Sequence, residues 1–125
     1  MSLLHAHLVF VTKYRLPVFT DAMLTFAETT MRSVCAALDV ELVEFNGETG
    51  HVHLLVAYPP TLAISVLAPR LKGCTAYAVR REFTGVCVRA RMRGHLWSPS
   101  YLAVSCGGAP LSIIKQYIDG QARPL

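Results

Sequence analysis

The chain has 125 residues, which is the usual size of one domain built around one hydrophobic core. Hydrophobic residues make up 53% of it and charged residues only 16%, so the composition excludes a disordered chain and predicts that some apolar surface is buried in an oligomer. Twelve basic against eight acidic residues give a net charge of +4, which suits a polyanionic partner without identifying one.

Cysteine usage and hydropathy predict the compartment. The cysteines are widely spaced, form no C-x-x-C pair and follow no secretory leader, so we expect a reducing cytosol and buried, apolar roles for all four: Cys35, Cys74, Cys87 and Cys106. No apolar stretch approaches the ~20 residues of a membrane span. The sequence therefore predicts a cytoplasmic protein with no membrane partner.

Three segments have the pattern of strands in the first half of the chain. Residues 5–13 and 51–58 are short, apolar and rich in β-branched and aromatic side chains, and residues 40–45 alternate loosely. Asn46 and Gly47 form a dipeptide that is typical of hairpin turns. We therefore expect residues 40–45 and 51–58 to form an antiparallel hairpin.

Apolar residues recur at helical spacing over residues 21–38, 62–83 and 111–121. Thr20 or Asp21 can cap the first of these helices, and Pro69 and Gly73 can bend or delay the second. Residues 85–94 are basic and bounded by glycines, and residues 95–106 predict one or two short extended pieces. The order β-α-β-β-α-β-α, without internal repeats, predicts one α+β domain over residues 1–125, with helices packed on a ferredoxin-like (RRM-like) antiparallel sheet.

A pair of histidines forms the first chemical motif. His51 and His53 stand two residues apart on a predicted strand, so their imidazoles project from the same face and can share one cation. Imidazole favours transition metals and Mg²⁺ prefers oxygen, so the site needs further oxygen ligands. The alternative is an ordinary pair of surface histidines. A histidine-triad hydrolase would need a third histidine where this chain has Leu55.

The last predicted helix carries the second motif. Tyr117 and Gln121 stand four residues apart, so they share one face of the helix and can reach one site together. A half-buried packing role for Tyr117 is the alternative.

Five sequence blocks resemble one family, the small single-tyrosine HUH transposases of the insertion-sequence-two-hundred group and their repeat-associated relatives. The blocks are HLVFVTKYRLPVF (7–19), GHVHLLV (50–56), LKG with RREF (71–73 and 80–83), LWSPSY (96–101), and GGAP with QYIDGQ (107–110 and 116–121). They occur in the family's order and span nearly the whole chain. The chain departs from the family at Gly50, where relatives usually carry an acidic residue.

The resemblance implies an HUH endonuclease fold and a function. His51, His53 and Gln121 correspond to the ligands of a divalent metal, Mg²⁺ or Mn²⁺, and Tyr117 corresponds to the nucleophile. The implied substrate is single-stranded DNA with hairpin ends, which is cut and rejoined through a 5′-phosphotyrosine without ATP. The implied assembly is a homodimer in which Tyr117 acts in trans.

Single-strand binding combines a basic surface with aromatic stacking. Six residues have the charge or ring for these contacts: Lys13, Tyr14, Arg15, Lys72, Arg80 and Arg81. A solvated charged face is the alternative for the basic side chains.

Three other functions remain open at this point. A catalytically silent DNA-binding protein on the same fold would keep the motifs without forming a covalent adduct. An RNA-binding module is disfavoured because no K/R-G-F/Y-G/A-F-V-x-F/Y run occurs. A structural metal-binding protein would explain His51 and His53 but not the spacing of Tyr117 and Gln121.

Overall fold

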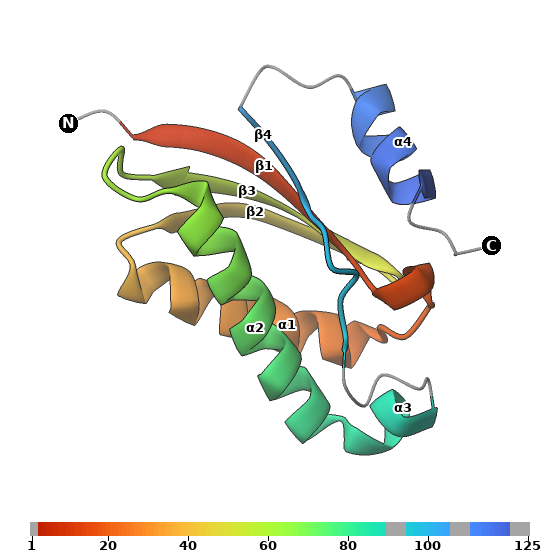
Figure 1. Ribbon diagram of the computed structural model, residues 1–125. Helices are drawn as coiled ribbons and strands as arrows, with labels where there is room; N and C mark the ends of the chain where they lie inside the picture. The colour runs from red at the N-terminus through yellow and green to blue at the C-terminus, as the bar shows by residue number, and fades with distance from the viewer. Residues whose placement is uncertain (1–2, 90–94, 106–110, 121–125) are drawn as a thin grey trace.

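A computed structural model describes residues 3–89, 95–105 and 111–120. Four strands form one sheet in the order β2-β3-β1-β4, and every neighbouring pair is antiparallel (Figure 1). The strands are β1 (Leu4–Val11), β2 (Glu41–Glu48), β3 (His51–Tyr58) and β4 (Leu102–Ser105). The ferredoxin-like α+β class predicted from the sequence is confirmed.

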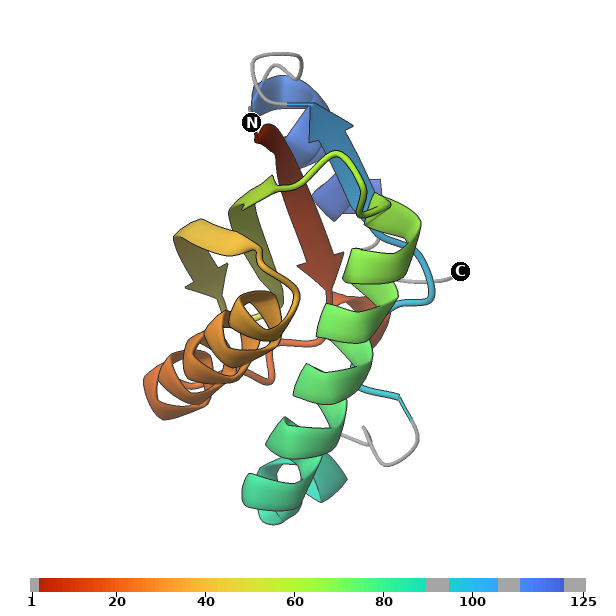
Figure 2. The same cartoon turned by 90° about the vertical axis from the view of Figure 1, so that its left-hand side faces the viewer.

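The helices cover both faces of this sheet. Two long helices, α1 (Asp21–Ala37) and α2 (Ile64–Glu82), cover one face, and α4 (Leu111–Gly120) lies over the other (Figures 1 and 2). The short helix α3 (Thr84–Arg89) follows α2, and a 3₁₀ turn, η1 (Lys13–Arg15), follows β1. Of the two predicted caps, Thr20 is the one that caps α1, because its side-chain oxygen accepts a hydrogen bond from the Met23 backbone N–H at 3.2 Å. No helix in the described ranges is both long and apolar enough to span a bilayer.

Strand alternation divides the apolar residues between two clusters. Leu8, Phe10 and Leu54 point toward α1 and α2 and are fully buried in the main core. Val9 and Val11 point the other way and are buried under α4. Because His51 and His53 alternate with the core residues of β3, they lie on the α4 face of the sheet.

The predicted turn at Asn46 and Gly47 is wrong. Both residues lie within β2, paired with His53 and Val52, and the turn is formed by Thr49 and Gly50. A β-carbon on Gly47 would lie 2.4 Å from Leu24 Cδ2 of α1. The glycine therefore permits the close approach of a helix side chain to the strand rather than a change of chain direction.

The residues after α2 also differ from expectation. The basic, glycine-bounded region over residues 85–94, to which the sequence assigned no element, is helical in its first part, as α3, and residues 90–94 lie outside the described residues. Of the cysteines, Cys35 and Cys87 are buried as predicted, whereas Cys74 is exposed and Cys106 lies outside the described residues. Burial raises the pKa of Cys35 to about 11, so its thiol stays protonated at neutral pH.

Two glycines give opposite expectations for replacement by alanine. A β-carbon on buried Gly50 would lie 3.1 Å from the Arg15 carbonyl oxygen and 3.2 Å from Arg15 Cγ, so Gly50→Ala should lower the free energy of unfolding by about 1 kcal/mol. A β-carbon on Gly73, inside α2, meets nothing within 4 Å, so Gly73→Ala should raise that free energy by roughly 0.5–1 kcal/mol. Urea unfolding followed by circular dichroism measures both changes. Shifts of the same sign in the two variants would contradict this account of Gly50.

Candidate active site

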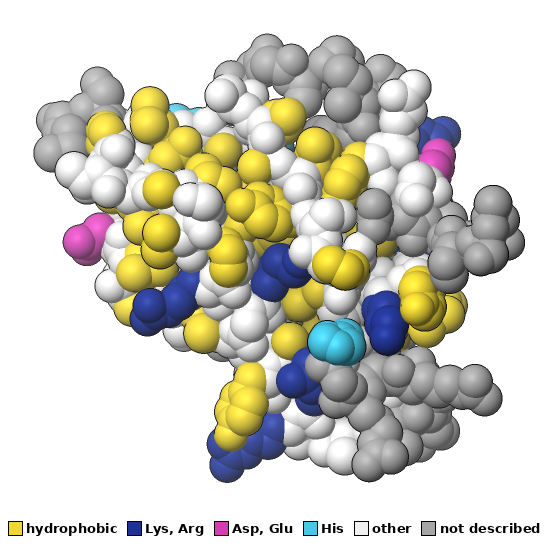
Figure 3. Space-filling view, in the orientation of Figure 1, with side chains coloured by type: hydrophobic (Ala, Val, Ile, Leu, Met, Phe, Trp, Pro, Cys, Tyr) yellow, Lys and Arg dark blue, Asp and Glu magenta, His cyan; other side chains and the backbone are white. Residues whose placement is uncertain are grey.

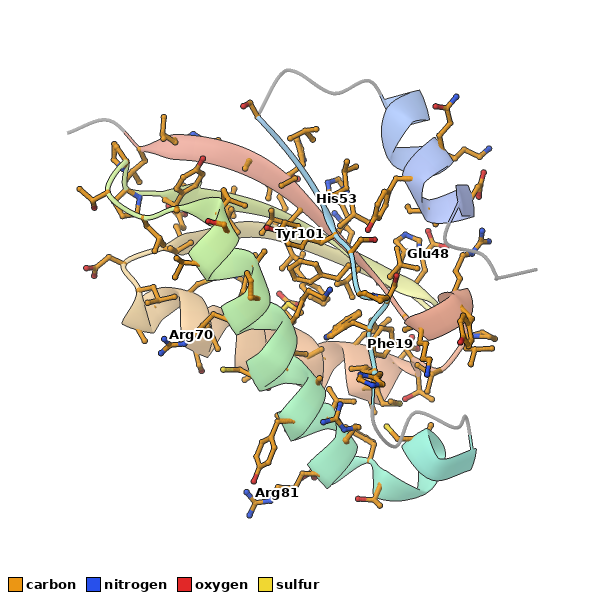
Figure 4. All side chains as sticks on the ribbon, viewed as in Figure 1. Phe19, Glu48, His53, Arg70, Arg81 and Tyr101 are labelled. Carbon is orange, nitrogen blue, oxygen red and sulfur yellow. The ribbon has the colours of Figure 1, made fainter. Side chains whose placement is uncertain are left out.

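The two predicted metal ligands lie side by side on β3, an interior strand of the sheet. His51 and His53 are both half-buried on the α4 face (Figure 4 labels His53). Burial lowers the pKa of each imidazole, and the nearby Glu48 carboxylate partly offsets this effect at His51. Both rings are therefore neutral at pH 7, which is the state that offers a lone pair to a metal ion.

A third histidine, not identified from the sequence, joins this pair. His7 on β1 has its Nδ1 atom 2.9 Å from Nε2 of His53, and one of the two rings donates a hydrogen bond to the other. The centroids of the two rings are 5.0 Å apart. The sequence held a usable signal, because His7 alternates with the core residues Leu8 and Phe10 and so had to face the same side as Val9.

Acidic and basic groups surround the histidines. Glu48 Oε2 lies 3.9 Å from His51 Nε2, and Figure 4 shows Glu48 beside the end of the hairpin. Glu44 also acts on His53, where its carboxylate raises the pKa against the effect of burial. An open hollow of about 630 Å³ lies between this part of the sheet and α4; its lining includes His51, His53, Glu48, Arg15, Lys115 and Asp119.

The donor set for a metal ion is incomplete within the described residues. No group of three or more histidine, cysteine, aspartate or glutamate side chains there is arranged to hold a metal. Gln121, the predicted third ligand, lies outside the described residues. Two neutral imidazoles beside a carboxylate fit a divalent cation of the Mn²⁺ type, provided that a further oxygen donor completes the site.

Tyr117 lies on the same face of the sheet as the histidines, but its hydroxyl group forms its hydrogen bond outside the hollow. Its half-buried side chain packs on the cluster of Val9 and Val11, which pair in register with His53 and His51. Its hydroxyl lies 3.0 Å from the Ser100 Oγ atom. Burial raises the pKa of Tyr117, and the Ser100 hydrogen bond opposes that rise. Ile118 and Asp119 line the hollow, whereas Tyr117 does not.

The turn after β1 connects the sheet to α4. Tyr14 and Arg15 both have left-handed backbone angles, with φ of 58° and 54°, an arrangement that costs about 1 kcal/mol or more per residue. Buried Thr12 holds the turn, since its hydroxyl has one proton to share between the carbonyls of Leu16 at 2.7 Å and Gly50 at 3.1 Å. Arg15 Nη1 then forms an ion pair with Asp119 Oδ1 of α4 at 3.0 Å.

The other predicted DNA contacts do not form one patch with this turn. Lys13 belongs to the turn itself and lies over the Tyr14 ring, 5.3 Å from its centroid, whereas the predicted contacts on α2 lie elsewhere. Arg80 lines a second hollow of about 290 Å³ between α2 and residues 95–99, and Arg81 points into solvent at the end of α2 (Figure 4). Basic side chains predominate over acidic ones on the face that carries α2 (Figure 3). Lys72 differs, because its ammonium group bonds to backbone carbonyls of this chain.

The fold and site define an α+β protein with paired histidines on an interior strand and a tyrosine-bearing helix on the same face. Comparison with known families gives the particular family. Residues 1–121 match the family described as "Transposase IS200 like", and the chain belongs to this family.

Named relatives and solved structures agree with that family. The ISDra2 transposase TnpA of Deinococcus radiodurans is 29% identical over 120 residues, which cover 94% of this chain and 84% of the relative. The IS200 transposase of Salmonella typhimurium is 27% identical over 115 residues, covering 92% and 74%. A crystal structure from Deinococcus radiodurans, assigned as a transposase, matches with a TM-score of 0.90 at 28% identity, covering 99% of this chain and 95% of that one.

A more distant structure shares the fold. It is a REP-associated tyrosine transposase bound to a REP hairpin, with a TM-score of 0.59 and 14% identity, covering 95% of this chain and 64% of that one. At this identity the likeness concerns the fold alone.

Proposed function

We propose that this transposase cleaves and rejoins single-stranded DNA at hairpin-bearing ends through a covalent 5′-phosphotyrosine intermediate. The observation that carries the proposal is the hollow between the His51 and His53 imidazoles and the helix that bears Tyr117. The hairpin bound to the REP-associated structure supports this class of substrate by analogy.

His51 and His53 would hold a divalent metal, Mg²⁺ or Mn²⁺, with Gln121 as a third ligand. The metal would neutralise charge on the scissile phosphate, which otherwise repels an incoming nucleophile. Glu48 would act beside the ligand pair, since its carboxylate lies 3.9 Å from His51 and can orient that ring.

Tyr117 supplies the attacking oxygen. Its phenol oxygen forms a bond to phosphorus as the bond to the 3′ oxygen breaks, which leaves a 5′-phosphotyrosine and a free 3′-hydroxyl. The phenol loses its proton in this step and the departing 3′ oxygen gains one. The new ester retains the energy of the phosphodiester for rejoining, so the reaction needs no nucleotide cofactor.

The basic turn and α2 would bind the DNA backbone. Lys13, Tyr14 and Arg15 offer two cations and an exposed ring next to the hollow, as single-strand binding requires. Arg80 and Arg81 add two basic side chains at the end of α2, apart from the turn. DNA that approaches Arg15 would compete with Asp119 for its guanidinium group.

A covalent-adduct assay tests the proposal. The protein is mixed with single-stranded oligonucleotides from both flanks of its own gene, with Mg²⁺ or Mn²⁺, and resolved under denaturing conditions. We expect a protein–DNA adduct that disappears when a chelator is added. Tight hairpin binding without an adduct would instead favour a catalytically silent DNA-binding protein on the same fold.

We also propose that the enzyme acts as a homodimer in which the Tyr117 helix of one subunit serves the metal site of the other. Exposed apolar side chains such as Val66 and Val43, 52% and 40% exposed, support an interface between subunits. Mixing Tyr117→Phe and His53→Ala proteins measures the arrangement, because a mixed dimer then contains one intact composite site. We expect the mixture to form adduct. A mixture as inactive as its two components would show that the site is assembled in cis, the arrangement in which α4 packs on the sheet of its own chain.

A further inference from the structure

The turn after β1 is held by backbone hydrogen bonds at the end of the sheet where β3 begins. The Thr12 backbone N–H donates to the Gly50 carbonyl at 3.0 Å, and the Arg15 N–H donates to the Thr12 carbonyl at 2.7 Å. On its other side the turn is tied to the segment before β4, because the Lys13 N–H donates to the Leu96 carbonyl at 3.0 Å. These bonds offset the cost of the left-handed φ of 54° at Arg15. The sheet therefore fixes the direction in which the Arg15 side chain leaves the backbone.

Gly50, the residue directly before His51, allows Arg15 to lie against the start of β3. A β-carbon on Gly50 would lie 3.1 Å from the Arg15 carbonyl oxygen and 3.2 Å from its Cγ atom. Any larger side chain at this position would have to displace the arginine from the strand. The close packing of these two residues therefore brings the arginine next to the first histidine of the pair.

The guanidinium group of Arg15 reaches the hollow that His51 and His53 line. Burial lowers the pKa of His51 most, the Glu48 carboxylate opposes that shift, and the charge of Arg15 adds to it, so the guanidinium lies near the ring. The Nη1 atom already binds an anionic oxygen, Oδ1 of Asp119, at 3.0 Å. The side chains of Arg15 and Asp119 are 40% and 57% exposed, so another anion can take the place of this carboxylate.

Arg15 keeps its place beside the histidines whichever subunit supplies Tyr117. The backbone bonds that hold the turn go to β1, to Gly50 and to the segment before β4, all of which belong to the same chain as the histidine pair. Helix α4 contributes the Asp119 carboxylate to Arg15. A helix that moved to the partner subunit would take this carboxylate with it and would leave the guanidinium free for an anion of the substrate.

We infer that Arg15 binds the scissile phosphate inside the hollow and is a catalytic residue of strand cleavage. The inference rests on the function proposed above and assigns one of the DNA contacts to the reacting group itself. The planar guanidinium fork would bind one non-bridging oxygen of this phosphate and leave the other to the metal held by His51 and His53. Because the turn fixes the side chain before DNA binds, little reorganisation is needed when Tyr117 attacks.

Two substitutions at residue 15 test the guanidinium group. Arg15→Gln should slow single-turnover adduct formation about thirtyfold, the loss expected for a hydrogen bond to a charged group. Arg15→Lys keeps the charge but lacks the planar fork, so it should restore only part of the rate. Arg70→Gln removes the same charge from an exposed position on α2 and should leave the rate unaltered (Figure 4). Wild-type rates in Arg15→Gln would overturn the inference.

Calorimetric titration with Mn²⁺ separates a phosphate contact from damage to the histidine pair. Arg15→Gln removes a cation near His51 and no donor, so it should bind Mn²⁺ at least as tightly as the wild-type protein does. A loss of rate in Arg15→Gln that is matched by a loss of Mn²⁺ affinity would overturn the inference, because the substitution would then act through the metal ligands.

A binding measurement identifies the phosphate that Arg15 contacts. Tyr117→Phe protein, which lacks the nucleophile, is titrated with single-stranded oligonucleotides that each carry one uncharged methylphosphonate. At the scissile position this change should weaken binding about tenfold when Arg15 is present and much less in the Arg15→Gln background, because both changes remove the same contact. At every other position the weakening should be equal in the two backgrounds.

The same scan separates this inference from the proposed function. If wild-type protein forms no adduct but Arg15 couples to one phosphate of the unpaired strand, the contact stands and the proposed cleavage is rejected. If an adduct forms and Arg15 couples to a phosphate other than the one that is cleaved, or to none, the proposed cleavage stands and the inference is overturned.

Discussion

Tyr117→Phe is expected to lower covalent adduct formation by at least about a thousandfold, because it removes the only proposed nucleophilic oxygen. The phenylalanine ring can still pack on Val9 and Val11, so the fold and hairpin affinity should survive. Burial raises the pKa of Tyr117, so in the wild-type protein little phenolate is present at pH 7 and the rate should increase as the pH rises. Gel separation of the adduct over a pH series measures both effects.

Tyr77→Phe is the matched control. Tyr77 is 62% exposed on α2, so DNA can reach its hydroxyl. It does not line the hollow beside α4, because α2 covers the other face of the sheet. This variant should form adduct at the wild-type rate. Adduct formation by Tyr117→Phe, with the DNA attached to another residue in peptide mapping, would reject Tyr117 as the nucleophile.

His51→Ala and His53→Ala should each lower metal-dependent adduct formation by at least about a hundredfold, since each removes one of two imidazole donors. Both histidines are half-buried in neutral form, so truncation to alanine removes a ligand without leaving an unpaired charge. Calorimetric titration with Mn²⁺ should show a parallel loss of affinity. The double replacement should remove measurable binding.

His5→Ala provides the control for that experiment. His5 lies on the face of the sheet that carries His51 and His53, but it is exposed near the start of β1. It should bind Mn²⁺ and form adduct as the wild-type protein does. If His51→Ala bound Mn²⁺ as tightly as the wild-type protein does, the histidine pair would not be the metal site. This would hold even if His51→Ala and His53→Ala both cleaved DNA slowly.

Alternation along the strands made the position of the histidine pair predictable. Apolar residues at 52, 54 and 56 require the α1 and α2 face, so His51 and His53 had to lie on the other face together. The cap at Thr20 was predictable for a similarly local reason, because capping depends on residues three apart in sequence.

Contacts between distant residues account for what could not be predicted. Gly47 has the sequence character of a turn, but the approach of Leu24 from α1 explains its presence inside β2. Lys72 has the character of a surface cation, yet the carbonyls of residues 98–100 surround its ammonium group. The hydroxyl pair of Ser100 and Tyr117 depends on α4 lying opposite α1 and α2, and periodicity does not specify which face a helix covers.

The pairing of β3 with β1 ties the chemistry to the stability of the sheet. A slip of one residue in this register would turn His51 and His53 into the main core and would expose Val52 and Leu54. Such a slip would be strongly destabilising, because it would bury polar imidazole rings and expose apolar side chains. Mutations that preserve a stable sheet therefore also preserve the orientation of the histidine pair, so the direction in which these imidazoles point is as robust as the core itself.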